Sequence, residues 1–379
     1  MLERGKDMRF LFTCGGTAGH INPAIGVAGR LKQLMPDCEM LFIGAEGMME
    51  TNLVPREGFE IRTVKISNIS RSLSFSGIKH NIKTVKNVIG SISAAKRIIR
   101  EFKPDAVIGT GGYVCYPVLK AAHSLGIPTI VHESNAVPGL TTRMLAGVVD
   151  CIMVGFEKAK DNYKAGTNVV YTGTPVRTDF LTYQKLKARK ELGIPADKAL
   201  VVSVWGSLGS GHMNAVMESF AAVAAEKQDF RLIHSAGKGG FEKLKTALDI
   251  SCPDRIEKGV DVRPYIYDMP RVMAAADLVM CRSGASTLAE LTAMGKPAVL
   301  VPSPNVTNNH QEKNARVLEE AGGARVFLEG EFSPESLYEE VCSMISEPQR
   351  LDVMSAAMTK AGVPDATDKI VDIILGFVK

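Results

Sequence analysis

Two glycine-rich loops are the first places in this sequence where chemistry is expected. Each follows a short apolar run and precedes a helical pattern: Phe10–Cys14 leads into Gly15–His20, and Val201–Trp205 leads into Gly206–Gly211. Glycine lets the backbone approach a ligand closely, and the N–H groups and dipole at a helix start favour negative charge, so such loops suit phosphate. The alternative for either loop is a purely structural tight turn.

The same loops argue against two common nucleotide-binding classes. Neither has G-x-G-x-x-G in the dinucleotide register, and no G-x-x-x-x-G-K-[ST] phosphate loop occurs, which disfavours a dehydrogenase and a P-loop ATPase. A third cluster, Gly109–Tyr113, follows the apolar run Ala106–Ile108. Ligands of open α/β sheets bind outside the carboxyl ends of the strands, so this cluster and Gly15–His20 are expected to line one pocket.

The densest constellation of glycine and polar residues is Cys281–Glu290, where a strand end passes into a helix. Glu290 falls about one turn inside that helix. Its carboxylate can accept two hydrogen bonds from a ribose diol, while the backbone N–H groups of Ala285–Leu288 face a diphosphate. The alternative is capping, because a carboxylate early in a helix stabilises it by about 0.3–1 kcal/mol without any ligand. Downstream, one loop holds Asn308, Asn309, His310 and Gln311, which is more polar side chains than a simple turn needs.

His20 is the best candidate for a general base. It follows a glycine loop at a helix start, and an imidazole titrates near neutral pH. The alternative role for a lone loop histidine is hydrogen bonding. A second polar cluster, His132–Asn135, follows the apolar run Thr129–Val131 at the same sheet edge. The seven histidines are dispersed and neither D-x-D nor H-E-x-x-H occurs, so we expect no protein-built metal site and no cofactor.

Alternating strand and helix patterns must position these residues. Short apolar runs separated by amphipathic stretches predict parallel sheets flanked by helices, because parallel strands need crossover connections. The predicted strands are Met8–Thr13, Met40–Ile43, Ala106–Ile108, Thr129–Val131 and Ile152–Val154, then Leu200–Val204, Arg231–His234, Leu278–Met280 and Ala298–Val301. The alternation of strand and helix patterns forms two successive series, one from Met8 and one from Leu200. The predicted fold class is therefore α/β with two Rossmann-like doubly wound domains. The first helix is expected to begin near Pro23, since proline suits a first turn.

Length and composition agree with two domains. A chain of 379 residues with 45% apolar, 23% charged and 6% aromatic residues exceeds what one hydrophobic core usually serves. We place the first domain at residues 1–175 and the second at 176–359. The linker is expected at Thr172–Thr178, and a last helix at about 360–379 is expected to pack back on the first domain.

Cysteine usage and hydropathy indicate the compartment. The seven cysteines are odd in number and never form C-x-x-C, which is typical of a reducing cytoplasm. The N-terminus has no apolar signal core, and no stretch approaches the roughly 20 apolar residues of a membrane-spanning helix. The sequence therefore predicts a protein that is neither exported nor membrane-spanning.

Basic residues are concentrated in the first half. Residues 1–175 hold 21 basic and 14 acidic side chains, whereas the rest of the chain holds 24 and 27. Within residues 62–103, ten basic side chains accompany a single acid, Glu101. We expect this half to meet something anionic, and a solvated helix face is the alternative.

Seven sequence blocks together resemble the MurG family. In chain order they are G-G-T-A-G-H, G-T-G-G-Y-V-x-x-P, H-E-S-N-A-V-P-G, G-T-P-V-R, G-S-L-G-S, C-R-S-G-A-S-T-L-A-E and N-H-Q-x-x-N-A. Their order and spacing match from about Met8 to the C-terminus. The resemblance implies a GT-B glycosyltransferase with two domains facing a cleft. It also implies transfer of GlcNAc, with inversion, from UDP-GlcNAc to the MurNAc 4-hydroxyl of lipid I, which gives lipid II.

The resemblance also implies roles for individual residues. The donor is expected mainly on the second domain and the lipid acceptor on the first, with Glu290 on the ribose, and His20 is our own candidate for the base. The other implied substrate-binding residues are Thr17, Ala18 and Gly19 at the sugar and diphosphate, Asn135 at the GlcNAc, Arg177 and Ser207 at the phosphates, Ile266 at the uracil, Ala285, Ser286, Thr287, Leu288 and Ala289 at the diphosphate, and His310 and Gln311 at the GlcNAc hydroxyls.

Three positions depart from the family pattern. Ala18 replaces the usual glycine of G-G-T-G-G-H, Ser134 replaces the usual glutamine of H-E-Q-N, and Ser207–Ser210 departs from G-S-Q-G-A. A methyl group at Ala18 is expected either to narrow the approach of a diphosphate or to require a different backbone conformation.

A lipid-bound acceptor suggests that the basic stretch of residues 62–103 binds the membrane. Ile78, Ile82, Val85 and Ile89 recur at helical spacing beside Lys79, Lys83 and Lys86. An apolar stripe flanked by lysines settles on anionic lipid, with about 1 kcal/mol for each charge near the surface. We therefore expect a peripheral protein on the cytoplasmic face of the cell membrane, at its anionic inner leaflet. The stripe packing on the sheet is the alternative.

Three other functions remain open at this stage. They are a GT-B enzyme with another acceptor, such as a diacylglycerol or a secondary metabolite, a non-catalytic nucleotide-sugar sensor, and a UDP-sugar epimerase on a similar fold. Cell-wall synthesis and division proteins are possible partners, and no nucleic-acid partner is expected.

Overall fold

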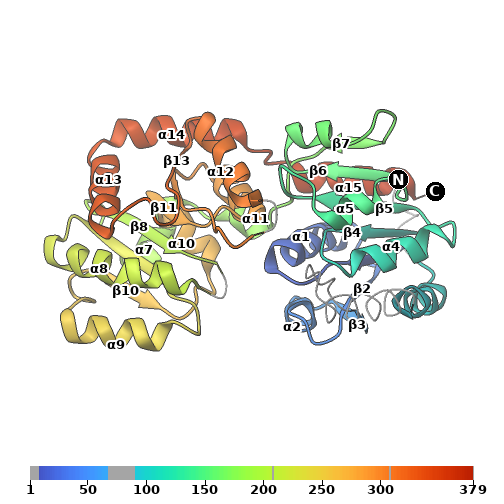
Figure 1. The fold of residues 1–379 in the computed structure, drawn as a ribbon, viewed down its shortest axis with the longest axis horizontal. Coiled ribbons are helices and arrows are strands. Elements are labelled where there is room, and N and C mark those ends of the chain that lie inside the picture. The colour runs from blue at the N-terminus through green and yellow to red at the C-terminus, as the bar shows by residue number, and fades with distance from the viewer. Residues whose placement is uncertain (1–7, 67–89, 207–208, 307–308, 379) are drawn as a thin grey trace, which may run out of the picture. The chain divides into compact units, whose positions relative to one another are not determined.

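The computed structural model describes residues 8–66, 90–206, 209–306 and 309–378, and the chain forms two compact units (Figure 1). The first unit consists of residues 1–177 together with residues 363–379, and the second consists of residues 178–362. The break after Arg177 falls inside the segment Thr172–Thr178, where the sequence led us to expect a linker.

The described residues of the first unit form a seven-stranded sheet. Its strands run in the order β3-β2-β1-β4-β5-β6-β7, and all neighbouring strands are parallel. Their bounds are β1 Arg9–Thr13, β2 Glu39–Ala45, β3 Glu60–Val64, β4 Ala106–Gly109, β5 Thr129–Glu133, β6 Cys151–Val154 and β7 Val169–Tyr171. The central strands β4, β5 and β6 are buried along their whole length, which explains why they read as short apolar runs.

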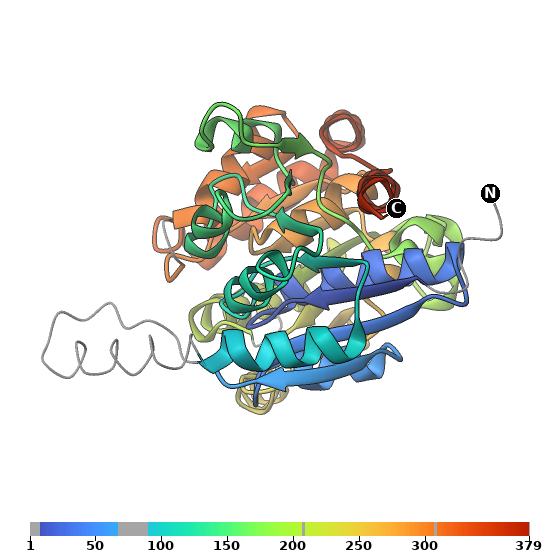
Figure 2. The same ribbon diagram turned by 90° about the vertical axis from the view of Figure 1, so that its right-hand side faces the viewer.

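Helices cover both faces of this sheet (Figure 2). On one face, Phe10 and Phe12 pack beneath α1, and on the other, Leu11 and Val107 pack beneath α4 and the helical residues 90–102. The helices of the unit are α1 Ala18–Leu34, α2 Glu50–Arg56, α4 Cys115–His123, α5 Leu140–Leu145, the 3₁₀ helix η1 Glu157–Asn162 and α15 Ala366–Phe377. Successive side chains of β1 point to opposite faces of the sheet, so this strand contributes to two hydrophobic cores, one on each side.

The expected start of the first helix near Pro23 is wrong. The helix α1 begins at Ala18, immediately after Thr17, whose backbone is extended at φ −144° and ψ 154°. Gly16 has φ +86°, which turns the chain sharply enough for the helix to begin at once. Pro23 is a buried residue inside the helix, and His20 consequently lies in its first turn.

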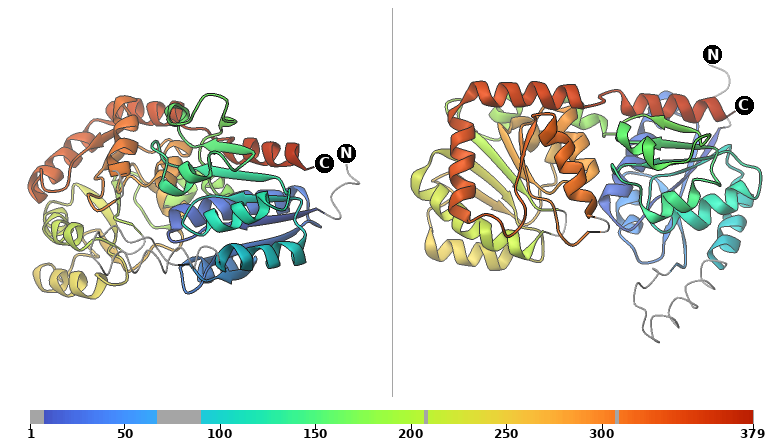
Figure 3. Two further views of the ribbon diagram at one scale, coloured as in Figure 1. Left: turned by 45° about the vertical axis from the view of Figure 1, so that its right-hand side comes forward. Right: turned by 45° about the horizontal axis from the view of Figure 1, so that its top comes forward.

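The C-terminal helix α15 belongs to the first unit, although it comes from the far end of the chain (Figure 3). Its buried residues Ile370 and Ile374 share a core with residues of β1 and α1. Arg30 of α1 forms an ion pair of 2.6 Å with Asp368, and the Thr367 hydroxyl donates to the Val176 carbonyl at 3.1 Å.

The described residues of the second unit form a six-stranded parallel sheet in the order β10-β9-β8-β11-β12-β13. Its strands are β8 Ala199–Val204, β9 Phe230–Ser235, β10 Val260–Arg263, β11 Leu278–Cys281, β12 Ala298–Leu300 and β13 Ala324–Val326. Its helices are α6 Thr178–Thr182, α7 Lys185–Glu191, α8 Gly211–Lys227, α9 Phe241–Ser251, α10 Met269–Ala275, α11 Ala285–Ala293, α12 His310–Glu320, α13 Pro334–Ser346 and α14 Pro348–Ala361. This order repeats that of the first six strands of the first unit, so the prediction of two doubly wound units is confirmed.

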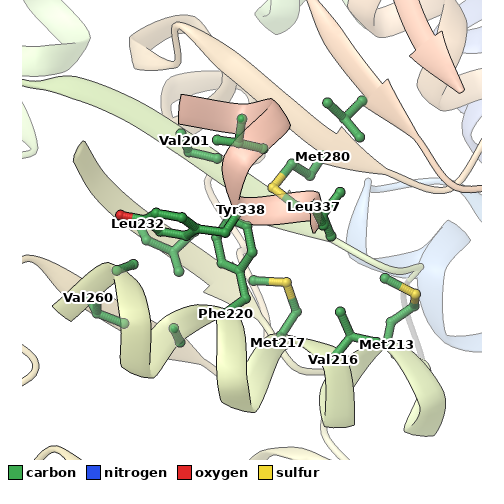
Figure 4. Close-up of a cluster of buried hydrophobic side chains, with 14 of the residues drawn as sticks. Val201, Met213, Val216, Met217, Phe220, Leu232, Val260, Met280, Leu337 and Tyr338 are labelled. Atoms are coloured by element: carbon green, nitrogen blue, oxygen red, sulfur yellow. The ribbon is translucent and has the colours of Figure 1, made fainter. Parts of the chain in front are cut away.

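The core of the second unit shows how α8 and α13 hold the sheet (Figure 4). Met217 and Phe220 of α8 and Tyr338 of α13 are buried with Val201 and Leu232 of the strands. Phe220 and Tyr338 meet edge to face, with their ring centroids 5.3 Å apart.

The four strands missed by the sequence prediction are the edge strands of the two sheets. The strand β3 alternates charged and apolar residues as Glu-Ile-Arg-Thr-Val, and β10 reads Val-Asp-Val-Arg. An edge strand is covered less completely than a central one, so it need not form an apolar run. The strands β7 and β13 are also edge strands, and each has only three residues.

Folding stability should depend on pH through the buried His234. Its imidazole is fully buried, with Nδ1 3.1 Å from the Ser203 hydroxyl, and burial lowers its pKa to about 4. The unfolded chain binds the proton at a pKa of about 6.5, so stability present above pH 6.5 is lost as the pH falls toward 4. Between pH 6.5 and 5 we expect the unfolding free energy of His234→Gln to fall by about 1–2 kcal/mol less than that of the wild type. Urea titrations at both pH values check this, and the exposed His212→Gln should behave like the wild type.

Candidate active site

In the first unit, two glycine loops meet where the strand order reverses. The loop after β1 and the loop after β4 leave the carboxyl ends of adjacent strands, which is where open α/β sheets bind ligands. The Gly15 N–H donates to the Gly111 carbonyl at 3.2 Å. A Cβ at Gly112 would lie 2.3 Å from the Gly15 carbonyl oxygen, so the two backbones touch. The structure thus brings together the two loops that were expected to line one pocket.

His20 is held between these loops. Its N–H donates to the Thr17 carbonyl at 3.0 Å, and its carbonyl accepts from the Thr110 hydroxyl at 2.6 Å. The imidazole lies against Gly111, where a Cβ would be 2.3 Å from Nδ1. His20 is half-buried, so a substrate hydroxyl can still reach this region.

A methyl group at Gly111 should therefore displace the His20 ring. Gly111 has φ +117°, so Gly111→Ala also strains the backbone. With His20 as the predicted base, we expect this variant to lower kcat about tenfold, because a small misplacement of a base is costly, while donor KM stays unchanged. Steady-state kinetics check this, with Gly126→Ala as the control because a Cβ there meets nothing within 4 Å and its φ of +73° imposes a comparable strain. Equal kinetics of the Gly111→Ala variant and the wild type would contradict the proposed packing.

Thr17, Ala18 and Gly19 form the exposed start of α1. Thr17 and Gly19 are exposed and Ala18 is partly exposed. The non-glycine residues with positive φ among those described are Lys103, Gln228 and Asn309, so the backbone of Ala18 has no left-handed strain. The alanine at this position consequently fits the helix without a special conformation.

The His132–Asn135 segment is ordered by a buried carboxylate. Glu133 accepts from the Asn135 N–H and side-chain amide at 3.0 Å each, from the Gly139 N–H at 2.9 Å and from the Thr142 hydroxyl at 2.7 Å. These bonds fix the loop and the Asn135 side chain together.

His132 is a structural histidine rather than a titrating group. Its Nε2 is 2.9 Å from the Gly173 carbonyl, so this nitrogen donates, and Nδ1 accepts from the Ser134 hydroxyl at 3.2 Å. Burial lowers the pKa of His132, which keeps the ring neutral. Ser134, one of the departures from the family pattern, therefore has a clear partner in this fold.

Arg177 closes the first unit. Its guanidinium Nη1 lies 3.8 Å from the Glu57 carboxylate, and its side chain is about one-third exposed. The structure thus places Arg177 beside an acidic residue of its own unit, whereas most of the residues expected to bind the UDP moiety belong to the second unit. Its phosphate contact stays a prediction.

In the second unit, Arg282 joins three strand-end loops. It follows β11 and donates to the Val301 and Pro302 carbonyls at 3.1 Å each and to the Ser210 hydroxyl at 3.0 Å. Its guanidinium also pairs with Glu329 at 2.6 Å. Arg282 lies in the predicted motif Cys281–Glu290, but the sequence alone indicated no role for it. These contacts show that it anchors the loops after β8 and β12, on either side of β11.

The helix α11 starts directly beside this anchor. Gly284 precedes it in an extended conformation, and Ala285 begins the first turn. Ala285, Ser286 and Leu288 are buried, while Thr287, Ala289 and Glu290 are partly exposed. Glu290 is the sixth residue of the helix, beyond the first turn in which a carboxylate stabilises the helix dipole. The stabilisation that a carboxylate gives in the first turn of a helix therefore does not account for Glu290.

The Glu290 carboxylate also lies near Cys281. Burial, and then the charge of Glu290, raise the pKa of the Cys281 thiol. Glu290 thus lies close to the end of β11, where the strand order of this sheet reverses between β8 and β11.

Three further predicted residues, His310, Gln311 and Ile266, follow strands of the second sheet. His310 and Gln311 begin α12, after Asn309 at φ +50°, and the Gln311 side-chain oxygen accepts from the Ser303 N–H at 2.9 Å. Ile266 follows β10 and is 2% exposed, so its side chain is nearly covered by protein. Ser207 and Asn308 lie outside the described residues, as do Ile78, Lys79, Ile82, Lys83, Val85, Lys86 and Ile89 of the basic stretch.

One cavity lies beside the predicted site loops, and another lies away from them. One of about 140 Å³ is lined by Gly15, Gly16, Glu50 and Tyr113 at the carboxyl edge of the first sheet. Another of about 510 Å³ is lined by Asp277, Lys296 and Pro297, at the amino ends of β11 and β12. This larger cavity lies at the edge opposite the start of α11 and is separate from the predicted donor residues.

Lys296 is the buried charge of the larger cavity. Its ammonium donates to the Ala274 and Ala276 carbonyls at 2.7 and 2.8 Å, and burial lowers its pKa to about 8. These two hydrogen bonds account for the burial of the Lys296 side chain, so its role is structural.

Neither a metal-binding cluster nor a membrane-spanning helix occurs in the described part of the chain. No group of three or more His, Cys, Asp or Glu side chains there is arranged to hold a metal ion. No helix formed by the described residues is long and apolar enough to cross a membrane.

Known proteins match the chain over nearly its whole length. The Glycosyltransferase family 28 N-terminal domain matches residues 10–154, and the corresponding C-terminal domain matches residues 200–370. A curated protein of Acetivibrio thermocellus is 41% identical over 373 residues, covering 98% of this chain and 99% of its own. It is named "UDP-N-acetylglucosamine--N-acetylmuramyl-(pentapeptide) pyrophosphoryl-undecaprenol N-acetylglucosamine transferase".

Solved structures agree on the fold. The crystal structure of Acinetobacter baumannii MurG matches with a TM-score of 0.73 and 27% identity, covering 97% of this chain and 99% of its own. A UDP-GlcNAc 2-epimerase of Neisseria meningitidis, bound to UDP-GlcNAc, matches with a TM-score of 0.65 and 16% identity, covering 98% and 100%. At that identity the epimerase shows a shared fold alone.

Proposed function

The chain belongs to the MurG family, within glycosyltransferase family 28, and we propose that it transfers GlcNAc from UDP-GlcNAc to the MurNAc 4-hydroxyl of lipid I. Lipid I is undecaprenyl-diphospho-MurNAc-pentapeptide, and the product is lipid II of peptidoglycan synthesis. The two-unit architecture is that of a GT-B enzyme. The observation that carries the proposal is the start of α11 with Glu290, which follows the loop anchor Arg282 where the strand order of the second sheet reverses.

The second unit supplies most of the donor contacts in this proposal. The N–H groups of Ala285–Ala289 receive the diphosphate, and the helix dipole favours its charge. Glu290 accepts hydrogen bonds from the ribose diol, and Ile266 lies against the uracil. Ser207 and Arg177 complete the contacts to the phosphates.

The GlcNAc is recognised by amide and imidazole groups. With its oxygen accepting from Ser303, Gln311 offers its amide nitrogen to a sugar hydroxyl, and His310 precedes it at the start of α12. Asn135 contributes from the first unit, where Glu133 fixes its side chain. A site built to hydrogen-bond sugar hydroxyls discriminates against analogues that lack them.

The chemical step follows from His20. The imidazole removes the proton of the acceptor 4-hydroxyl as its oxygen attacks the anomeric carbon of GlcNAc. The new carbon–oxygen bond forms as the bond to the UDP phosphate breaks, so the anomeric configuration is inverted. Thr17, Ala18 and Gly19 border the sugar and diphosphate at the helix start. The departing UDP carries negative charge, which the helix dipole and Arg177 stabilise.

We also propose that the protein acts as a peripheral protein at the cytoplasmic face of the membrane, where the lipid-bound acceptor lies. The basic stretch with Ile78, Lys79, Ile82, Lys83 and Lys86 supports this by its composition. Each lysine near anionic lipid contributes about 1 kcal/mol, so Lys83→Ala should weaken binding to anionic vesicles about fivefold. Vesicle co-sedimentation checks this, with the exposed Lys243→Ala as the control. Equal weak binding of the wild type to neutral and anionic vesicles would contradict membrane contact.

Product analysis tests the function itself. Labelled UDP-GlcNAc is incubated with a lipid I analogue, with a diacylglycerol, and with no acceptor. We expect label in a disaccharide lipid only with the lipid I analogue. Label transferred to the diacylglycerol would favour another acceptor class, and conversion of UDP-GlcNAc to its 2-epimer without acceptor would favour the epimerase alternative.

A further inference from the structure

Glu50 is a buried carboxylate that connects the glycine loop after β1 to the end of β2. It is the first residue of α2 and is fully buried. Its Oε1 accepts from the Ala45 N–H at 2.8 Å, and its Oε2 accepts from the Gly16 N–H at 3.0 Å. Both carboxylate oxygens are thus engaged by backbone groups of two different loops.

Two glycines provide the space for this carboxylate. A Cβ at Gly15 would lie 2.4 Å from Glu50 Oε1, and a Cβ at Gly44 would lie 2.5 Å from Glu50 Cγ. Any side chain at either position would push Glu50 away from its two donors. The glycines of the first loop therefore accommodate a protein carboxylate in addition to approaching a ligand.

The hydrogen bond from Gly16 to Glu50 fixes a backbone segment that continues into the turn containing His20. Gly16 has φ +86° and is followed by Thr17, the residue that precedes α1 and whose carbonyl accepts the His20 N–H. The position of Gly16 therefore sets where the first turn of α1 begins. Glu50 does not contact the imidazole, so it acts on His20 only through this backbone.

Stability alone does not explain a carboxylate at this position. Taking a charge out of water is costly, and well-packed apolar groups often replace buried charges at no loss of stability. A charge-assisted hydrogen bond is about twice as strong as a neutral one and is more exact in geometry. The site also adjoins the 140 Å³ cavity lined by Gly15, Gly16 and Tyr113, so the carboxylate lies beside space open to a substrate.

From these contacts we propose that Glu50 is a positioning residue for the transfer reaction. It fixes Gly15–Thr17 so that the His20 imidazole faces the acceptor hydroxyl. This inference rests on the proposed function, because it assigns to Glu50 a role in acceptor activation. Most donor contacts are assigned to the second unit, so donor binding should depend on Glu50 only weakly.

The test compares Glu50→Gln with the wild type. Glutamine keeps the size of the side chain, but its NH₂ group cannot accept a backbone N–H, so one of the two bonds is lost. Because a displacement of about 1 Å costs about 100-fold in rate, we expect kcat to fall 10- to 100-fold. The KM for UDP-GlcNAc and the melting temperature should stay near the wild-type values. The exposed neighbour Glu46→Gln is the matched control and should keep the wild-type kcat.

A second measurement does not depend on activity. The NMR signal of the His20 ring Cε1–H should move in Glu50→Gln, while that of the exposed His212 should not. If the wild type transfers no GlcNAc, the proposed function fails, and the His20 signal still shows whether Glu50 positions the ring. A folded Glu50→Gln variant with kcat within twofold of the wild type, or with an unmoved His20 signal, would overturn the inference.

A shorter carboxylate covers the case in which Glu50→Gln does not fold. Glu50→Asp keeps the charge but loses one methylene, so it cannot reach both donors, and it is judged by the same kinetic and NMR criteria. Failure of both variants to fold would also overturn the inference, because Glu50 would then be needed for the fold rather than for the placement of His20.

Discussion

Replacing His20 by alanine should lower kcat for GlcNAc transfer by about 1,000-fold, within the range of general acid–base catalysis. The imidazole lies in the first turn of α1 and is packed on Gly111, at the carboxyl edge of the first sheet. Without it, no proposed group accepts the proton of the attacking hydroxyl. The KM for UDP-GlcNAc should change by less than threefold, because the second unit supplies most of the donor contacts in the proposal.

The kinetics of His20→Ala need a histidine control from the same unit. His123 is exposed at the end of α4, so His123→Ala should keep the wild-type kcat. The calorimetric affinity for UDP should be the same in both variants. Turnover of His20→Ala near the wild-type rate would remove His20 from the role of base.

Replacing Glu290 by glutamine should raise the KM for UDP-GlcNAc by about 100-fold. A carboxylate that accepts two ribose hydroxyls makes two charge-assisted hydrogen bonds, and hydrogen bonds to charged groups contribute about 1.5–3 kcal/mol each. Glutamine can accept with only one of its two terminal atoms, so about one such bond and part of the other are lost. The measurement is steady-state kinetics with calorimetric binding of UDP, and Glu331→Gln is an exposed control in the same unit.

A ligand analogue separates ribose recognition from a general loss of fold. The wild type should bind UDP much more tightly than 2′-deoxy-UDP, and Glu290→Gln should bind both with similar affinity. Equal discrimination by the wild type and the variant would contradict the ribose role of Glu290.

The central strands were predictable because burial on both faces leaves a clear trace in the sequence. The runs around Phe10–Phe12 and Val201–Val204 are apolar for that reason, and both became central strands. The edge strand Glu60–Val64 alternates charge with apolar residues and was missed. The start of α1 was misplaced because the proline rule was applied to Pro23, whereas the left-handed Gly16 determines where the helix begins.

The candidate site was predictable where glycine and polar residues follow a strand directly. His20, Asn135 and Glu290 were found in this way. Glu50 and Arg282 were not assigned roles, because each acts through contacts with residues far along the chain. Glu50 bonds Gly16 across 34 positions, and Arg282 bonds Ser210 across 72. Only the folded chain brings these partners together.

The most direct test of the account is a crystal structure of the protein soaked with UDP. The account predicts the diphosphate at the N–H groups of Ala285–Leu288 and the ribose diol on the Glu290 carboxylate, at the carboxyl edge of the second sheet. UDP bound elsewhere, for example in the 510 Å³ cavity beside Lys296 at the opposite edge, would contradict it.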